Sequence, residues 1–213
     1  MTGGPDIDYY DWPGGREAML CFGPLRPRVL LALPLFEEYN RTRTFAVTLL
    51  HMLAGRGIGG MLPDWPGTGE SRVPTDQMTL AAIRAAYRAL VDDRAPIFAV
   101  SIRSGALLDV GVPVVARWHL APQEGAELIR ELERQRSAEG DVAGNVISAL
   151  SLAELAGATV APARVLRMES DPRPADRKLQ GSPIWRRAEP ANDRPLAQIL
   201  ADDIADWIAT CVA

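Results

Sequence analysis

The sequence predicts an α/β domain of three layers, in which helices cover both faces of a mostly parallel sheet. Short runs such as residues 28–33 are almost wholly apolar, as expected for strands that are buried on both faces. These runs alternate with segments whose apolar residues recur at helical spacing. The 213 residues, 47% of them hydrophobic, are enough for one well-filled core and too few for two. We therefore expect one domain over residues 1–213, with a polar lead at 1–15.

The first half of the chain contains three expected strands and two expected helices. A polar loop at 34–43 leads into a helix on which Phe45 and Leu49 keep helical spacing, and Thr79 is a suitable N-cap for the next helix. In chain order we expect strands at 17–22, 28–33 and 58–62, a first helix that ends at Gly55 or Gly57, a Pro/Gly turn at 63–71 and a second helix over 80–91.

The second half continues the alternation. In chain order we expect a strand at 95–100, about two helical turns at 104–110, a strand at 112–120, a helix at 124–136, a strand or turn passing into a short helix within 141–159, a strand at 163–169, a loop at 170–177 and a final helix capped by Asn192 or Asp193. Ligands of such sheets bind beyond the carboxyl ends of the strands. We therefore expect a site among the loops at 34–43 and 63–71 and the turns after residues 102 and 120.

Composition and charge argue against several classes of function. A net charge of −4 and a pI near 5.3 give no general attraction to nucleic acid or anionic membranes. Cys21 and Cys211 lie near opposite ends of the chain, which indicates neither a disulfide framework nor a metal cluster and favours a cytoplasmic location. The N-terminus lacks the pattern of a signal peptide, and no apolar run approaches the roughly 20 residues of a membrane span. We expect no metal and no cofactor, and the oligomeric state is left open.

The segment 98–108 carries the strongest functional pattern. An apolar strand runs directly into the turn Ser101-Ile102-Arg103-Ser104-Gly105 and then into an apolar helix. In the G-x-S-x-G elbow of serine hydrolases, the nucleophilic serine occupies the tip of such a strained turn, and small neighbours allow the turn to form. This alignment places Arg103 at the tip, so the turn is present while an arginine stands in the position of the nucleophile.

The order of the motifs resembles the α/β-hydrolase fold, with PLFEEYNR (34–41), DWPGTGES (64–71) and the Arg103 turn each following a strand. Within that fold, the chain is most similar to hydrolase-like proteins associated with the exosortase (PEP-CTERM) sorting system of exopolysaccharide-producing bacteria. Those proteins share a P-x-x-E-E-x-N loop, a G-x-R-x-G elbow and a late GSPIW-type segment near a glutamate, here 181–185 and Glu189. The resemblance covers residues 28–210 and implies an α/β-hydrolase-like three-layer sandwich with a reduced or absent cap.

The usual catalytic triad cannot be assembled from this sequence. A serine hydrolase needs a serine at the tip, a histidine base after the last strand and an acid that orients the histidine. Of the two histidines, His51 falls within the first helix, where we interpret it as a surface or packing residue. His119 ends a strand at the expected functional edge and is a candidate to line the site. No histidine follows it.

Arg103 and Ser104 each allow two interpretations. At a helix N-terminus, the Arg103 guanidinium can bind a carboxylate, phosphate or sulfate. Alternatively, Arg103 forms a structural ion pair with Glu37 or Glu38, which is the interpretation that we favour. Both predict a buried Arg103 with an acidic partner. Ser104 could replace the missing nucleophile, but we favour a helix-capping role for its side chain, with its backbone N–H at the place of an oxyanion donor.

The other candidate residues come from loops at the same edge of the sheet. Glu37 and Glu38 are neighbours on one loop, so they are poorly placed to face each other across a substrate. Asp64, with Thr68 and Ser71, is expected to fix its turn through side-chain to backbone hydrogen bonds. The predicted ligand-binding set, in which Trp185 forms a wall and Glu189 is a partner for an arginine, is Arg103, Ser104, Asn40, Arg43, His119, Trp185 and Glu189.

These inferences combine into one predicted function and one alternative. We predict a hydrolase-fold protein with a degenerate elbow that binds a small anionic or acyl ligand, or a protein partner, with a link to exopolysaccharide or exosortase systems. The alternative is an active esterase or thioesterase. Its catalytic candidates are Ser104 as nucleophile, or Glu37, Glu38 or Asp64 as the activator of a water molecule.

Overall fold

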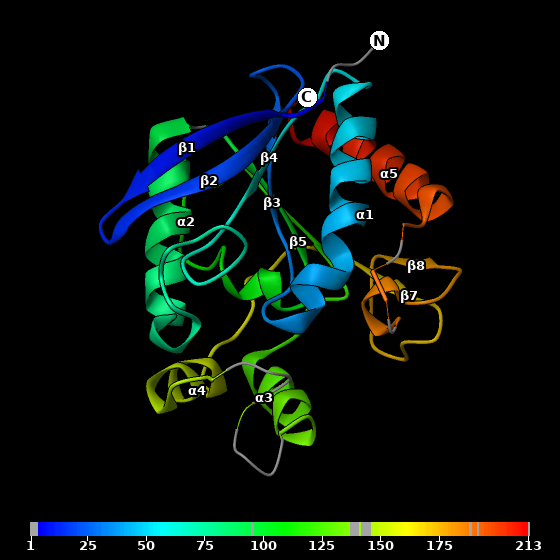
Figure 1. The fold of residues 1–213 in the computed structure, drawn as a ribbon. Helices are drawn as coiled ribbons and strands as arrows, with labels where there is room; N and C mark the ends of the chain where they lie inside the picture. Colours follow the sequence, from blue (N-terminus) through cyan, green and yellow to red (C-terminus); the bar gives the residue numbers. More distant parts are fainter. Residues whose placement is uncertain are drawn as a thin grey trace.

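The computed structural model describes residues 4–94, 96–136, 141, 146–187, 189–190 and 192–212. Within these residues, eight strands form one sheet in the order β1-β2-β4-β3-β5-β6-β7-β8 (Figure 1). The strands are β1 (Asp6–Trp12), β2 (Gly15–Phe22), β3 (Arg28–Ala32), β4 (Gly59–Pro63), β5 (Phe98–Ile102), β6 (Arg117–Leu120), β7 (Arg164–Met168) and β8 (Arg177–Leu179). The helices are α1 (Glu37–Ala54), α2 (Leu80–Arg94), α3 (Gly125–Arg134), α4 (Ala149–Ala156) and α5 (Arg194–Val212), with short 3₁₀ helices η1 (Thr75–Gln77), η2 (Arg103–Leu107) and η3 (Ile184–Arg186).

The sheet is antiparallel at one edge and parallel elsewhere. β1 and β2 form an antiparallel hairpin, and β2 also pairs antiparallel with β4. From β4 through β3, β5, β6 and β7 to β8, every pairing is parallel. The carboxyl ends of these parallel strands therefore meet at one edge, which is where open α/β sheets bind their ligands.

Helices cover both faces of the sheet. α1 and α5 lie together on one face and α2 lies on the other (Figure 1). β3 shows how the sequence supports both layers, because successive side chains of a strand point to opposite faces. Val29 and Leu31 belong to the core with α1 and α5, whereas Leu30 and Ala32 belong to the core with α2. The predicted three-layer α/β arrangement is confirmed.

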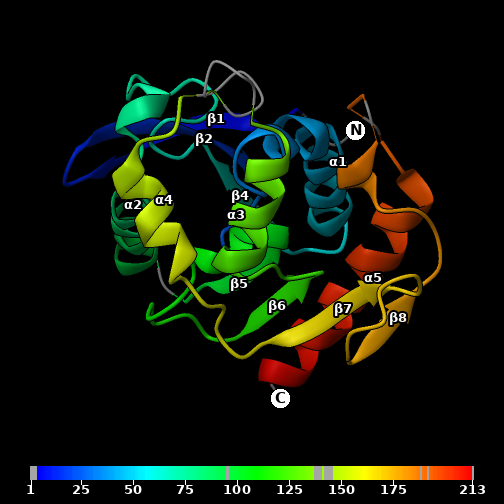
Figure 2. The same ribbon diagram turned by 90° about the horizontal axis from the view of Figure 1, so that it is seen from below.

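The helices α3 and α4 lie beyond the carboxyl ends of the strands. They pack against each other, and α3 also contacts η2, which follows β5. They lie at the bottom of Figure 1 and nearest the viewer in Figure 2. The segment between β6 and β7 thus stands over the edge of the sheet at which a ligand site is expected.

The predicted N-caps of the second and the final helix are confirmed. Ala82 N donates to Thr79 Oγ1 at 3.1 Å just before α2, and Leu196 N donates to Asp193 Oδ1 at 3.0 Å at the start of α5. The short helix expected within 141–159 is α4. Residues 142–145 of that segment, and Ala95 of the strand expected at 95–100, lie outside the described residues.

The largest correction concerns the predicted polar lead at 1–15. Much of it, Asp6–Trp12, is the edge strand β1, which is paired with β2 over its whole length. An edge strand exposes most of its side chains, so its sequence can remain polar. Tyr10 anchors it, since this side chain is buried and its hydroxyl donates to the backbone oxygen of Asp64 at 2.7 Å.

Three further boundaries differ from the prediction. The loop expected at 34–43 ends early, because α1 begins at Glu37 with two acidic residues in its first turn, where the helix dipole favours negative charge. Within the strand expected at 112–120, regular strand structure begins only at β6, although Val115 N already donates to Ile97 O at 2.8 Å. Pro113, which has no N–H for a ladder, lies before this pairing. β8 forms at the end of the loop expected at 170–177.

None of the described helices has both the length and the apolar character needed to cross a membrane.

Candidate functional site

The turn after β5 has the backbone conformation of a nucleophile elbow. β5 ends at Ile102, and Arg103 adopts a left-handed conformation with φ of 55° before η2 continues the chain. A Cβ atom on Gly105 would lie 2.4 Å from the carbonyl oxygen of Ala32 and 2.7 Å from that of Leu33. Glycine is therefore required for the elbow to pack against the end of β3. The predicted turn is confirmed, with Arg103 at its tip.

Backbone strain gathers at this edge of the sheet. Among the described residues, those other than glycine with a left-handed φ are Phe36, Arg103 and Ala121, which follow β3, β5 and β6. Such conformations cost free energy and cluster at functional sites when the surrounding structure enforces them. Three strained residues beyond three neighbouring strands mark this edge as the candidate site.

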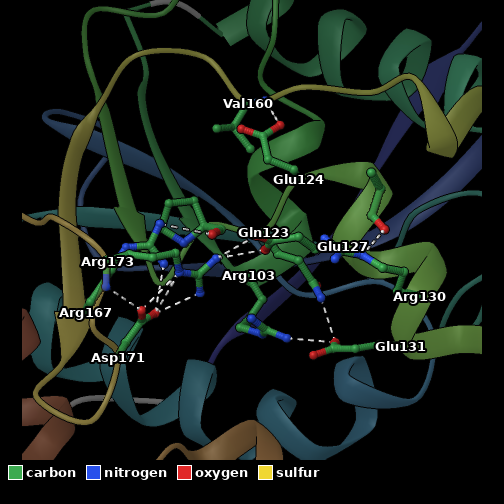
Figure 3. Close-up of polar contacts among 12 residues, drawn as sticks. Arg103, Gln123, Glu124, Glu127, Arg130, Glu131, Val160, Arg167, Asp171 and Arg173 are labelled. Atoms are coloured by element: carbon green, nitrogen blue, oxygen red, sulfur yellow. Dashed lines mark hydrogen bonds and ion pairs between the residues drawn. The ribbon is translucent and has the colours of Figure 1, made fainter. Parts of the chain in front are cut away.

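Arg103 is held by two carboxylates, an arrangement that we call the Arg103 clamp. Its Nε donates to Glu38 Oε2 at 3.2 Å, and its Nη2 donates to Glu38 Oε1 at 3.3 Å and to Glu131 Oε2 at 2.9 Å. The Arg103 side chain is only 6% exposed. Gln123 Nε2 also donates to Glu131 Oε2, at 2.6 Å (Figure 3), and the guanidinium lies over the Trp185 ring at 5.5 Å from its centre.

The clamp confirms the expectation that Arg103 is buried with an acidic partner, and it identifies the partners. Glu38 is one of the two predicted glutamates. Glu37 instead pairs with Arg41, one helical turn away. Glu131, on α3, was missed, because a glutamate on a highly charged helix looks like a surface residue. Burial raises the pKa of the Glu38 carboxyl, Arg103 opposes this rise, and the neighbouring charge of Glu131 adds to it.

Ser104 does not face a ligand. Its side chain is fully buried, and its Oγ accepts a hydrogen bond from Leu35 N at 2.9 Å. The favoured interpretation of its side chain as a helix cap is therefore wrong, because the hydroxyl instead ties η2 to the loop between β3 and α1. In hydrolases with this type of elbow, an N–H of the equivalent loop helps to bind the oxyanion. Here the Leu35 N–H is already occupied.

His119 does not line the site. It is fully buried, and its Nε2 lies 2.8 Å from Asp109 Oδ2, which also accepts a hydrogen bond from Ser101 Oγ at 3.0 Å. The prediction was wrong because of strand parity. Its neighbours Trp118 and Leu120 belong to the core with α1 and α5, so the His119 side chain points to the opposite face of the sheet.

A cleft of about 750 Å³ lies beyond the carboxyl ends of β5, β6 and β7, between α3 and the loops that flank β8. Arg103 and Trp185 of the predicted set line it. The full lining is Arg103, Ala121, Glu127, Arg130, Glu131, Glu133, Arg134, Met168, Ser170, Asp171, Pro172, Arg173, Pro183, Trp185 and Arg186.

The other predicted loop residues lie elsewhere. Glu37 and Asn40 line a separate hollow of about 300 Å³, and Arg43 and Asp64 line another of about 880 Å³ under the β1–β2 hairpin. Glu189 is exposed and is not part of the cleft lining. The structure therefore separates most of the set that the sequence grouped together.

Asp64 has the structural role that was predicted for it. Its carboxylate accepts hydrogen bonds from Tyr39 Oη at 2.5 Å, from Arg43 Nη1 at 2.7 Å and from Glu70 N at 3.1 Å. Thr68 Oγ1 accepts from Trp65 N at 2.8 Å in the same turn. With its oxygens engaged and 2% of the residue exposed, Asp64 is poorly placed to activate water.

A second charged group lies beside the clamp and was missed from the sequence. Asp171, just after β7, accepts from Arg167 Nη1 at 3.0 Å and from Arg173 Nη2 at 2.7 Å, and Arg173 Nη1 also donates to Glu127 at 2.8 Å (Figure 3). Hydrogen bonds from Arg173, outweighing burial, hold the pKa of Asp171 well below its usual range. The sequence signal that could have identified Asp171 is its position, since the acid of a hydrolase triad lies between the elbow and the final histidine in the chain.

Among the described residues, no group of three or more His, Cys, Asp and Glu side chains is arranged to hold a metal ion.

Comparison with solved structures agrees with this architecture. The crystal structure of a "putative hydrolase" from Agrobacterium vitis S4 superimposes with a TM-score of 0.62 at 16% identity, over 98% of this chain and 98% of that one. The chain has an α/β-hydrolase-like fold. An epoxide hydrolase from Vigna radiata matches at a TM-score of 0.47 and 19% identity over 56% of this chain, and one from an endophytic Streptomyces at 0.42 and 27% over 55%.

The chain spans about two fifths of the length of these epoxide hydrolases, 41% and 37% respectively. No family model and no curated protein matches the sequence. The superposition on the Agrobacterium vitis structure supports the hydrolase-like fold, and the similarity to exosortase-associated proteins is an inference from motifs alone.

Proposed function

We propose that this chain is a hydrolase-fold protein that binds a small anionic or acyl ligand in the cleft without hydrolysing it, and that Arg103 is a structural clamp at the position of a nucleophile. The observation that carries the proposal is the clamp itself. A guanidinium stays protonated at physiological pH and is not a nucleophile, and here it is hydrogen-bonded to two carboxylates in a buried position.

The rest of the elbow supports binding over hydrolysis. Ser104, the nearest hydroxyl, is fully buried and accepts the Leu35 N–H, so neither group is available to attack or to stabilise an ester carbonyl. The sequence contains no histidine after His119, so no imidazole base follows β8.

The candidate carboxylates favour the same conclusion. Glu37, Glu38 and Asp64 are each engaged in an ion pair with an arginine, and none of the three lines the cleft. A general base must reach the proton that it removes, directly or through one water molecule. A cleft of about 750 Å³ lies within the range of small-molecule sites, which favours a small ligand over a protein partner. The motif similarity suggests the exosortase systems as the biological setting.

Labelling and turnover assays test the proposal. The full chain and its Ser104→Ala variant are treated with a fluorophosphonate probe and with a panel of p-nitrophenyl esters and acyl thioesters. We expect no covalent labelling, and no turnover by the wild type beyond that of Ser104→Ala. Turnover that Ser104→Ala abolishes, with label on Ser104 in the wild type, would establish the esterase alternative instead.

A further inference from the structure

In the deep part of the cleft, both arginines are already paired with carboxylates. Arg103 is shared by Glu38 and Glu131, and Arg173 is shared by Asp171 and Glu127. An anion that approached either arginine would meet two carboxylates at hydrogen-bonding distance from the same guanidinium. Repulsion between like charges at such a site costs free energy that a single additional contact does not recover.

The mouth of the cleft has the opposite charge. Arg130 and Arg134 project from α3, and Arg186 from η3 on the other wall; all three are exposed. Within the described part of the chain, the Arg130 side chain hydrogen-bonds only to the backbone oxygen of Ala126, at 3.2 Å. Arg134 lies 3.9 Å from Glu131, beyond hydrogen-bonding distance, with 74% of its side chain exposed.

Arg186 has no hydrogen bond or ion pair through its side chain to any residue that the structure describes. Glu133 is the remaining carboxylate of the lining, and no residue that the structure describes is paired with it. Three arginines at the mouth therefore face one such acid. Of the cations in the cleft, these three arginines are best able to bind a further carboxylate or phosphate, because their planar guanidinium groups can donate two parallel hydrogen bonds to it.

The floor between these charges is apolar. Ala121, Met168 and Trp185 line the cleft and are almost fully buried, at 2%, 1% and 4% exposure. They are the groups that an alkyl or acyl chain would cover, and burying each methylene of such a chain contributes about 0.8 kcal/mol. The cleft thus combines an apolar floor with a cationic mouth.

From this arrangement, and resting on the proposed function, we infer that the cleft binds an amphipathic anion in a defined orientation. The anionic head contacts Arg130, Arg134 and Arg186 at the mouth, and the alkyl chain lies against Ala121, Met168 and Trp185. The ligand class is an oxyanion on an apolar chain, whether a fatty carboxylate or an alkyl phosphate. Arg103 shapes the floor and does not bind the head.

Calorimetric titration with octanoate, octyl phosphate and the uncharged methyl octanoate tests this orientation. The variant is the triple exchange Arg130→Gln, Arg134→Gln and Arg186→Gln, and the matched control is Arg72→Gln, an exposed arginine outside the cleft. We expect the triple variant to raise the Kd of at least one of the two anions by about tenfold or more, while the Kd of methyl octanoate stays unchanged. The tighter anion identifies the head group.

The outcomes separate this inference from the proposed function. Anions that bind the triple variant and the wild type equally well overturn the orientation but leave the proposed function standing. The same holds if binding of methyl octanoate weakens as much as that of the anions. If none of the three compounds binds the wild type, both the proposed function and the orientation fall.

Discussion

Removing the Arg103 side chain should destabilise the fold strongly. Arg103→Ala leaves Glu38 and Glu131 close together, with Gln123 at 2.6 Å and the exposed Arg134 at 3.9 Å as polar neighbours of Glu131. Removing one partner of a buried ion pair costs about 3–5 kcal/mol. Because the two carboxylates keep 20% and 28% of their side-chain exposure, water compensates part of this loss, and we expect about 2–3 kcal/mol.

The left-handed backbone of Arg103 provides an internal control. At φ of 55°, any residue with a Cβ is strained, whereas glycine is not. Arg103→Gly removes the same ion pairs as Arg103→Ala but relieves strain of about 1–2 kcal/mol, partly offset by the larger entropy of glycine in the unfolded chain. We expect the glycine variant to be more stable than the alanine variant by about 1 kcal/mol.

The pH dependence follows from Glu38. Burial raises the pKa of the Glu38 carboxyl above its ordinary value of 4.5. At pH values between 4.5 and this raised pKa, the folded protein holds a proton that the unfolded chain has lost. The contribution of Glu38 to the free energy of unfolding is therefore complete below pH 4.5 and is lost as the pH rises through the pKa of Glu38 in the folded protein. Losing Arg103 raises that pKa further, so the destabilisation by Arg103→Ala should be larger at about pH 7.5 than at about pH 4.5.

Urea unfolding followed by tryptophan fluorescence, at both pH values, measures all three stabilities. Equal stability of the wild type and Arg103→Ala would refute the clamp. Equal stability of the alanine and glycine variants would refute the strained elbow, and a destabilisation independent of pH would refute the role of Glu38.

Two further variants test the packing of the elbow and a buried carboxylate on α5. Gly105→Ala should cost about 3 kcal/mol or prevent folding, because its Cβ would lie 2.4 Å from the backbone oxygen of Ala32; circular dichroism and soluble yield report this, and a native-like melting temperature would contradict it. Asp203 accepts from Trp118 Nε1 at 2.9 Å and from Arg164 Nε at 3.0 Å. Although burial opposes it, hydrogen bonding to these groups lowers the pKa of Asp203 to about 2. Its contribution to stability is therefore full above pH 3.8 and is lost as the pH falls from 3.8 through the folded pKa of about 2. Asp203→Asn should cost about 2 kcal/mol near neutral pH and much less near pH 2, in acid and urea titrations; an unchanged midpoint at neutral pH would contradict this.

The fold was largely predictable because its signals are local. Apolar runs such as β3 and β5 are buried on both faces, and the caps Thr79 and Asp193 are recognisable from a few neighbouring residues. The edge strand β1 was missed, because its short alternation of Asp with Ile7 and Tyr9 is embedded in a polar segment and most of its side chains are exposed.

Only part of the site was predictable from the sequence. The elbow sequence placed Arg103 correctly, and the acidic loop supplied Glu38 as its partner. Glu131 and Arg173 come from a charged helix and a polar loop, and they become site residues only when the sheet brings α3 and the β7–β8 loop together. The prediction for His119 was wrong because a residue at the end of a strand can point to either face of the sheet. Successive side chains alternate between the faces, so His119 points away from the face on which Trp118 packs.

A crystal structure of the wild-type chain with octanoate tests the central claim most directly. The account predicts that Arg103 keeps its hydrogen bonds to Glu38 and Glu131 and that the octanoate carboxylate contacts arginines at the mouth. A carboxylate bound to Arg103 with Glu131 displaced would contradict it.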